Sequence, residues 1–178
     1  MSSEADGRPA PELSSEEFRR ACARFPTGVA IASVMDSQGI PHGLTVNSFT
    51  SVSLDPPLIL ICLGHEVTSI DVFREASHFA INVLAEDQRE ISTRFAHKGY
   101  DRFDGLEWRR GESGAPLLAG VLAEIECALY RRVPAGDHDI LIGEMLRGQI
   151  HTGDPLVYFG SRYRRLAPAQ DSAAELVR

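Results

Sequence analysis

The chain has 178 residues, of which 43% are hydrophobic and 24% are charged, so it suits a single domain with a packed core. Its net charge of −7, without a run of Lys or Arg, argues against nucleic acids and anionic membranes as main partners. No apolar run approaches the ~20 residues of a membrane span, and the polar, acidic start lacks the features of a signal peptide.

The chain is predicted to begin with a disordered lead-in and a short helix. Residues 1–12 are rich in Ser, Glu, Pro and Gly, a composition that favours disorder. Ser14 and Glu17 form a capping-box pattern, and apolar residues follow at helical spacing. Pro26 cannot continue a helix, so we expect this helix to end before it.

The rest of the chain predicts mostly strands, interrupted by two helices. Apolar and β-branched runs bounded by turn residues predict strands over residues 28–35, 40–49, 58–63, 78–84, 121–132, 139–151 and 156–159. The run over 58–63 is continuously apolar, which indicates a strand buried on both faces. Helices are predicted over 68–76, capped by Thr68 or Ser69, and over 86–95.

Two further stretches predict no regular structure. Residues 97–116 contain four glycines, and the polar tail over 168–178 is expected to be flexible. We therefore expect one domain over 13–167, mainly β with short helices and built as a β-barrel. No G-x-G-x-x-G follows a strand, which argues against a Rossmann dinucleotide site.

Cysteine and histidine spacing predicts neither disulfides nor a metal site. Cys22, Cys62 and Cys127 are far apart, and their odd number fits reduced thiols of a cytoplasmic protein. The histidines are scattered without the spacing of a zinc site. Cys62 follows apolar residues, where a cysteine behaves as a small hydrophobe rather than a redox thiol.

The most informative stretch is 42–58, where small hydroxyl and amide side chains alternate with apolar ones. On a strand, Thr45 and Asn47 point to one face, and Val46 and Ser48 point to the other. Thr45 and Asn47 can thus offer hydrogen bonds to a flat heterocycle. Taken alone, the same pattern also fits a half-exposed strand with ordinary polar residues.

Ser51 and Ser53 are expected past the strand, where hydroxyls and backbone N–H groups can meet a phosphate. The run G-x-T-x-N-S-F-x-S-V-S-x-x-P-P-L, which starts at Gly43, resembles the signature of the flavin reductase-like domain family. That family includes the reductase components of two-component flavin monooxygenases. The resemblance covers most of the chain, because further motifs fall at the family's spacings: Gly28-Val29, Asn82-Val83-Leu84, Ser92-x-x-Phe95 and Gly136-Asp137-His138.

The resemblance implies a split β-barrel that forms a homodimer, with FMN or FAD held near the dimer interface. Thr45, Asn47 and Ser48 would contact the isoalloxazine ring. The full set of flavin-binding positions that it implies is Gly43, Leu44, Thr45, Val46, Asn47, Ser48, Ser51, Ser53, Cys62, Leu63, Gly64, Thr68, Ser69, Arg94 and Phe95.

Two parts of that set are assigned to the phosphate end of the flavin. Thr68 and Ser69 start a helix, whose free N–H groups and partial positive charge suit a phosphate. Arg94 and Phe95 match an R-F position that the family places near the ribityl-phosphate or adenylate. Without the resemblance, Ser69 would be a plain helix cap and Arg94 a solvated charge.

The second strong motif, Gly136-Asp137-His138, resembles the G-D-H turn that this family uses to bind NADH or NADPH. A histidine beside the flavin can stack on the nicotinamide without donating a proton, because hydride passes directly between the two rings. Asp137 is expected to fix the turn or orient His138. Tyr163, near the end of the final strand, is a second candidate contact for the pyridine nucleotide.

The expected function is therefore an NAD(P)H-dependent flavin reductase, with His138 as the catalytic residue, that supplies reduced flavin to a partner monooxygenase. The first alternative is a split-barrel flavoprotein oxidase of the pyridoxamine-phosphate type, which would need a basic phosphate cluster that residues 42–69 lack. The second alternative is a non-catalytic flavin carrier, against which the Gly136-Asp137-His138 turn argues.

Overall fold

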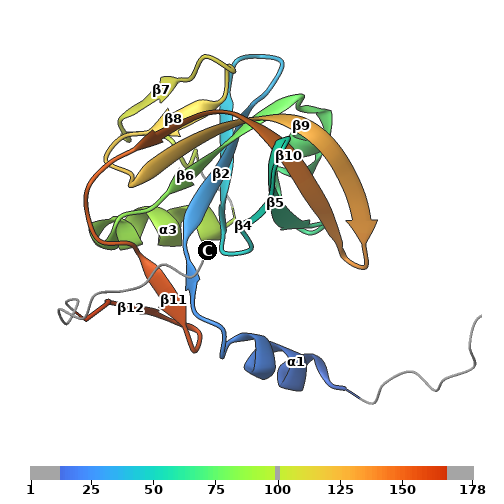
Figure 1. Ribbon diagram of the computed structural model, residues 1–178, viewed down its shortest axis with the longest axis vertical. Coiled ribbons are helices and arrows are strands. Elements are labelled where there is room, and N and C mark those ends of the chain that lie inside the picture. Colours follow the sequence, from blue (N-terminus) through green and yellow to red (C-terminus); the bar gives the residue numbers. More distant parts are fainter. Residues whose placement is uncertain (1–12, 99–100, 168–178) are drawn as a thin grey trace, which may run out of the picture.

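A seven-stranded antiparallel sheet forms the body of the molecule (Figure 1). The computed structural model describes residues 13–98 and 101–167; the predicted lead-in over 1–12 and tail over 168–178 lie outside the described residues. The strands follow the order β3-β2-β6-β9-β10-β5-β4 across the sheet. Their bounds are β2 Ala30–Met35, β3 Pro41–Val46, β4 Thr50–Leu54, β5 Pro57–Gly64, β6 His78–Val83, β9 Ala123–Ala135 and β10 His138–Ile150.

Two small sheets and several short helices surround this body within the described residues. One small sheet joins β1 Thr27–Gly28, β11 Val157–Phe159 and β12 Arg162–Arg164, and the other joins β7 Trp108–Arg110 and β8 Pro116–Leu118. The helices are α1 Ser15–Cys22, α2 Ile70–Glu75, the one-turn η1 Glu86–Gln88 and α3 Arg89–Ala96. Across residues 13–98 and 101–167, no helix has the length and apolar character needed to cross a membrane.

The sheet is open along a seam between its two edge strands. β3 and β4 stand at opposite ends of the strand order, yet they are joined by residues 47–49 alone. Four Cα–Cα steps span at most about 14 Å, so the sheet must curl until its edges nearly meet. The middle of the predicted flavin segment therefore bridges this seam.

Two hydrophobic clusters hold the curled sheet together. The first fills the inside of the sheet and includes Ile61, Leu63 and Phe79, with Phe73 of α2 packed against them. The second lies under α3, where Phe95 packs edge-to-face on Phe103 with ring centroids 5.0 Å apart. Aromatic and aliphatic side chains pack closely in this second cluster, and this packing holds α3 against β3.

Most predicted elements are confirmed. The fold is mainly β with short helices, and the capping box is present, because the Ser14 hydroxyl accepts from Glu17 N and the Glu17 carboxylate accepts from Ser14 N. Ser69 stands at the N-cap of α2, although its side chain makes no capping hydrogen bond. The predicted helix over 86–95 starts as one turn of 3₁₀ helix before α3.

Several predictions about strands are wrong. The strand expected over 40–49 ends at Val46, so the alternation of faces does not extend to Asn47 and Ser48. Ser51 and Ser53 do follow that strand, but they belong to a further strand that was not predicted, β4, which pairs with β5. Residues 97–116 contain β7 and the start of β8, and Tyr163 lies on a separate strand, β12.

The prediction that 58–63 is buried on both faces is also wrong. Burial alternates along β5: Ile59, Ile61 and Leu63 are buried inside the sheet, whereas Leu58, Leu60 and Cys62 are only partly covered. The continuous apolar run thus marks a strand with an apolar outer face rather than a strand enclosed on both sides. That outer face adjoins the predicted site.

Candidate functional site

The flavin segment crosses from one edge of the sheet to the other, and Ser48 fastens it in place. The Ser48 hydroxyl accepts a hydrogen bond from Cys62 N at 2.9 Å and lies 3.2 Å from Cys62 O. Pairing between β4 and β5 stops at Thr50 and Leu60, so the Ser48 side chain continues the ladder where the β4 backbone has ended. Segment 47–49 is thereby held beside the end of β5.

The neighbours of Ser48 differ in what they offer to a ligand. Asn47 is exposed and lies outside both flanking strands, so its amide is accessible. Thr45 is committed to the fold, because its hydroxyl donates to Ser92 O at 2.6 Å. The Ser92 hydroxyl is in turn 2.8 Å from the hydroxyl of Tyr163, which places β12 beside α3 and the back of the segment.

The Gly-Asp-His turn forms the tip of the long β9–β10 hairpin. Gly136 adopts φ +61°, which the first position of such a two-residue turn requires and which a side chain disfavours. Asp137 Oδ1 lies 2.7 Å from His138 Nδ1, and this contact lowers the pKa of the Asp137 carboxyl below its usual range. Both side chains are exposed, so the imidazole is oriented and still accessible.

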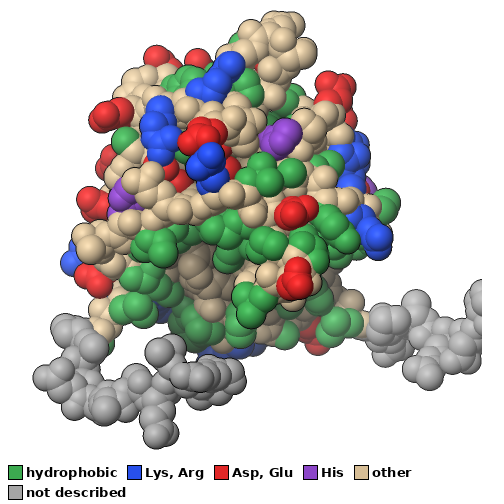
Figure 2. Space-filling view, turned by 45° about the horizontal axis from the view of Figure 1, so that its top comes forward, with side chains coloured by type: hydrophobic (Ala, Val, Ile, Leu, Met, Phe, Trp, Pro, Cys, Tyr) green, Lys and Arg blue, Asp and Glu red, His purple; other side chains and the backbone are tan. Residues whose placement is uncertain are grey.

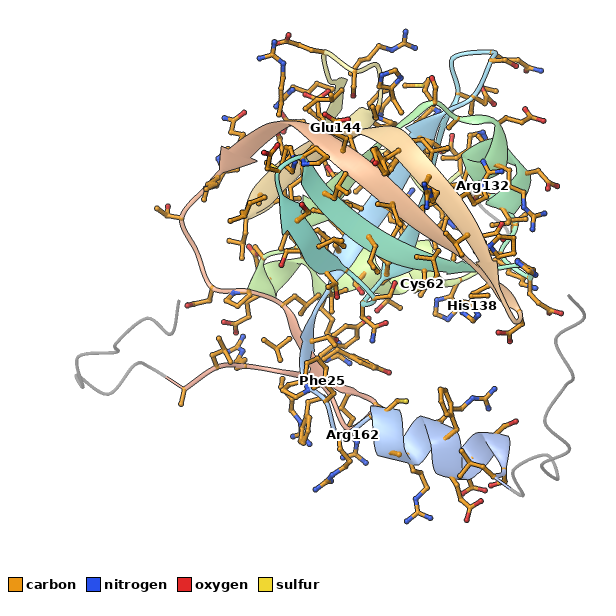
Figure 3. All side chains as sticks on the ribbon, turned by 45° about the vertical axis from the view of Figure 1, so that its right-hand side comes forward. Phe25, Cys62, Arg132, His138, Glu144 and Arg162 are labelled. Carbon is orange, nitrogen blue, oxygen red and sulfur yellow. The ribbon has the colours of Figure 1, made fainter. Side chains whose placement is uncertain are left out.

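The two motifs meet at the end of β5. His138 lies opposite Gly64 in the β5–β10 pairing, and its ring is so close that a Cβ on Gly64 would be 3.5 Å from Nε2. Cys62, bonded to Ser48, precedes Gly64 by two residues and therefore shares its face of the strand. Figure 3 shows Cys62 and His138 at the same end of the sheet, away from Glu144.

The sheet face around this junction is largely apolar. Residues paired across β5 and β10 share a face, and the partly covered side chains there are Leu58, Leu60, Cys62, Ile140 and Ile142, with Glu144 opposite Leu58 at the far end. Burial raises the pKa of the Cys62 thiol, against the opposing effect of the Ser48 hydroxyl, so this cysteine remains a neutral thiol. An apolar sheet face bordered by the Asn47 amide fits one side of a planar, amide-bearing ring such as a flavin.

Other predicted flavin positions are buried or make hydrogen bonds within the fold. Phe95 is 1% exposed, and its ring packs under Gly43, where a Cβ would come within 2.8 Å of Phe95 Cε1. Arg94 directs its guanidinium to the carbonyls of Asp101 and Asp104, at 3.0 and 2.5 Å. The remaining buried members of the predicted set are Leu44, Val46, Leu63 and Ser69.

The predicted phosphate positions lie on different elements of the fold. Thr68 is exposed at the start of α2, a helix of only six residues. Ser51 and Ser53 lie on β4, on either side of a β-bulge. The structure therefore brings Asn47, Ser48, Cys62, Gly64 and His138 together, and leaves the phosphate assignments as predictions.

Sequence reasoning missed one feature behind the junction. Asp139, the residue after His138, is only 4% exposed, and its carboxylate accepts hydrogen bonds from His65 and Arg74 at 3.1 and 3.0 Å. Asp139 lies 74 residues from His65 and 65 residues from Arg74 along the chain, so no local pattern connects it to them. The only signal in the sequence is a charged residue at an inward-facing position of a strand.

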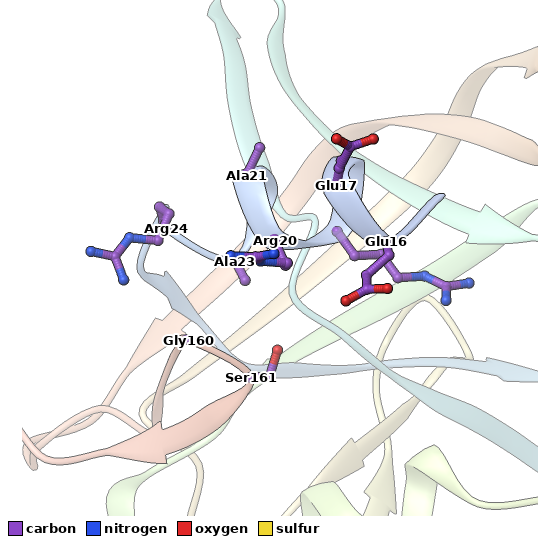
Figure 4. Close-up of a pocket in the computed structure, with 9 residues that line it drawn as sticks. Glu16, Glu17, Arg20, Ala21, Ala23, Arg24, Gly160 and Ser161 are labelled. Carbon is purple, nitrogen blue, oxygen red and sulfur yellow. The ribbon is translucent and has the colours of Figure 1, made fainter. Parts of the chain in front are cut away.

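A separate hollow of about 900 Å³ lies between α1 and the turn that joins β11 to β12 (Figure 4). Charged side chains of α1 line it, among them Glu16, Glu17 and Arg20, together with Gly160 and Ser161. None of the predicted flavin or nicotinamide positions lines this hollow. In the part of the chain that the structure describes, no group of three or more His, Cys, Asp or Glu side chains could hold a metal ion.

Comparison with known proteins identifies this arrangement. Residues 22–167 match the family described as flavin reductase like domain. The chain belongs to this family. The match spans both the segment around Ser48 and the hairpin that carries His138, so both motifs lie within the domain that defines the family.

Individual relatives resemble this flavin reductase-like chain over most of its length. The FMN reductase (NADH) SmoA of Agrobacterium fabrum is 43% identical over 153 residues, which cover 86% of this chain and 87% of that protein. The actinorhodin polyketide dimerase of Streptomyces coelicolor is 44% identical, with coverage of 85% and 86%. The NADH:FAD oxidoreductase SgcE6 of Streptomyces globisporus, solved with NAD and FAD fragments, superposes with a TM-score of 0.83 at 41% identity, covering 88% of this chain and 94% of that one.

Proposed function

We propose that the chain is an NAD(P)H-dependent flavin reductase that reduces FMN or FAD and supplies the reduced flavin to a partner monooxygenase. The observation that carries this proposal is the meeting of two motifs at the end of β5. The Ser48 hydroxyl of the flavin segment is hydrogen-bonded to the backbone of Cys62, and His138 of the Gly-Asp-His turn lies over Gly64. Two planar rings bound at these motifs would be neighbours.

The chain's own residues would bind and orient the two rings. A bound flavin would supply the redox chemistry, accepting a hydride from the nicotinamide. The apolar face around Cys62 would support one side of the flavin and exclude water, and Asn47 would hydrogen-bond its polar edge. His138, fixed by Asp137, would hold the nicotinamide by stacking or hydrogen bonding. Tyr163, whose hydroxyl is hydrogen-bonded to that of Ser92, would be the second contact for the nucleotide.

The named relatives favour reduction over the two alternatives. One relative is named as an NADH-dependent FMN reductase and a second, of solved structure, as an NADH:FAD oxidoreductase. Further relatives are named as reductase components of monooxygenases that act on trigonelline and 4-nitrophenol. These names support a reductase that serves a partner oxygenase, rather than an oxidase or a flavin carrier.

One assay tests the proposal. The purified chain is mixed with NADH or NADPH and with FMN or FAD, and loss of nicotinamide absorbance is followed near ~340 nm. We expect catalytic turnover with at least one of the four combinations. Flavin binding without any turnover would leave the carrier function, and turnover of a pyridoxamine phosphate with oxygen alone would indicate the oxidase.

We further propose that the open sheet is a split β-barrel that works as a homodimer. α1 is amphipathic, but none of its residues is buried, and Phe18 and Phe25 are 57% and 75% exposed. Figure 2 shows hydrophobic side chains gathered in a band across one face of the molecule. Exposed apolar area of this kind typically marks an interface. Light scattering should therefore give twice the chain mass of 19.5 kDa, and a monomer at micromolar concentration would contradict the dimer.

We propose that 13–167 form one flavin reductase-like domain. The predictions for 1–12 and 168–178 concern residues outside those that the structure describes. We also propose that the protein acts in the cytoplasm, which is supported by three free cysteines, Cys22, Cys62 and Cys127. Limited proteolysis tests the boundaries, since cleavage should stop at a fragment close to 13–167.

A further inference from the structure

We propose that Asp139 is a positioning residue for His138: its buried carboxylate, held by His65 and Arg74, fixes the hairpin tip that carries His138 over Gly64. This inference rests on the proposed reductase function, and adds to it a residue that makes no contact with either substrate. It predicts that Asp139 controls how well the nicotinamide is held while leaving the flavin site unchanged.

The Asp139 carboxylate is buried, and both of its oxygens have hydrogen-bond partners. The Asp139 side chain is 5% exposed, with Oδ1 3.1 Å from His65 Nε2 and Oδ2 3.0 Å from Arg74 Nε. The Arg74 guanidinium, followed by His65, holds the pKa of this carboxyl below its usual range despite burial. An ionised carboxylate has no proton to give, so both partners donate to it.

The geometry of β10 places His138 and Asp139 on opposite faces of the strand. Adjacent residues of a strand point to opposite faces, so His138 faces the site while Asp139 points inward behind it. Arg74 belongs to α2, and His65 directly follows β5. Asp139 therefore ties the base of the hairpin tip to two elements that are themselves packed on the core.

The tip of the β9–β10 hairpin makes few other contacts that would fix its position. Residues 133–138 are all exposed, so no hydrophobic packing fixes their position. Besides the strand pairing that ends at Gly64, the tip is held by His65 N, which donates to Asp137 O at 2.9 Å. His65 thus contacts the tip twice, once through its backbone and once through the Asp139 carboxylate.

The groups around Asp139 connect β10 with α2 and β9. The Arg74 guanidinium also contacts Asp71 at 3.3 Å, and the Arg74 carbonyl accepts from the guanidinium of Arg132 on β9. Removing the charge of Asp139 would leave Arg74 paired with Asp71 and partly exposed to water. The fold should therefore tolerate Asp139→Asn better than most losses of a buried charge.

The test is a double-mutant cycle on steady-state kinetics. Asp139→Asn should raise the KM for NADH on the order of tenfold, because a small displacement of an orienting group is costly. The flavin dissociation constant should change less than about twofold. In a His138→Ala background, Asp139→Asn should have no further effect on that KM, because the residue through which it acts is gone.

The matched control is Asp71→Asn, which removes the other carboxylate of Arg74 from an exposed position and should leave the KM unchanged. The proposal is overturned if Asp139→Asn has no effect, or if its effect persists undiminished in the His138→Ala background. If Asp139→Asn does not fold, His65→Gln, which keeps the Arg74 contact, replaces it in the same cycle.

A second readout separates this inference from the proposed function. The imidazole resonance of His138, assigned by its loss in His138→Ala, should shift in Asp139→Asn and stay in place in Asp71→Asn. An unshifted resonance overturns the positioning role whether or not the protein is active. A wild-type protein without flavin reduction, but with the shift, overturns the proposed function alone.

Discussion

Asn47 and Ser48 are neighbours in the chain with different duties. Ser48 is bonded to both backbone groups of Cys62, so it serves the fold at the seam, whereas Asn47 is exposed there. The sequence predicts both as flavin contacts, because the motif includes both. It could not show that the Ser48 hydroxyl is occupied, since its partner lies 14 residues along the chain.

Asn47→Leu should weaken flavin binding without unfolding the protein. Leucine has similar size but offers no hydrogen bond to the polar edge of the flavin, a loss of about 1 kcal/mol or roughly fivefold in affinity. Quenching of flavin fluorescence measures the dissociation constant. Gln38→Leu, in the exposed turn between β2 and β3, is the control. An unaltered dissociation constant would remove Asn47 from the site.

His138→Ala should slow NADH-driven flavin reduction by at least tenfold while changing flavin affinity little, because the imidazole acts on the nicotinamide. Stopped-flow reduction of bound flavin separates the two effects. His151→Ala, which removes another exposed imidazole, should have no effect on the rate. Equal rates for both variants and the wild type would exclude a role for His138.

Residues far apart along the chain account for what the sequence did not predict about the site. The predicted set included positions that the structure brings together at the end of β5, and it also included Phe95 and Leu63, which are buried. Conversely, Asp139 depends on partners 74 and 65 residues away. Spacing identifies residues that share an element, and tertiary packing alone brings such partners together.

At the scale of elements, long strands with clear apolar patterns were predictable, whereas of the three-residue strands only β11 was predicted. β2, β5, β6, β9 and β10 were all expected within a few residues of their bounds. β4 was missed because its polar Ser51-Val52-Ser53 sequence and the following prolines resemble a loop. β7, β8 and β12 have only three residues each, which is too short for any periodicity.

The packing of α3 on β3 gives Gly43 a structural role. A Cβ there would come within 2.8 Å of Phe95 Cε1 and 3.1 Å of Ala32 O. Gly43→Ala should therefore lower the free energy of unfolding by about 1–3 kcal/mol, the usual cost of overpacking. Denaturant titration measures the change. Gly28→Ala, with nothing within 4 Å, should not be destabilising, and equal effects would argue against the steric explanation.

For the whole molecule, three aspartates link stability to pH. Hydrogen bonds lower the pKa of all three carboxyls. The largest contribution comes from Ile40 N for Asp36, from His138 for Asp137 and from Arg74 for Asp139. A carboxyl whose pKa is lower in the folded state stabilises the fold above its unfolded pKa of about 3.9. That contribution is lost as the pH falls through the folded pKa.

The Tm should therefore be constant above about pH 5 and should fall as the pH decreases below about pH 4. Calorimetry at pH values from about 5 down to about 3 measures this decrease, the acid limb of the Tm profile. Asp139→Asn should make the limb shallower, because one of the linked groups no longer titrates. A wild-type Tm that stays level to pH 3 would show that these carboxyls are equally acidic in the unfolded chain.

The open seam has a consequence for how copies of the chain can associate. β3 and β4 present unpaired backbone edges, which in other sheets recruit strands from neighbouring molecules and begin aggregation. Here β3 starts at Pro41, which has no N–H to offer, and β4 is short and interrupted by a bulge between Ser51 and Ser53. Neither edge is a good template for sheet extension, so the dimer proposed above would form through apolar faces and not by pairing of these edge strands.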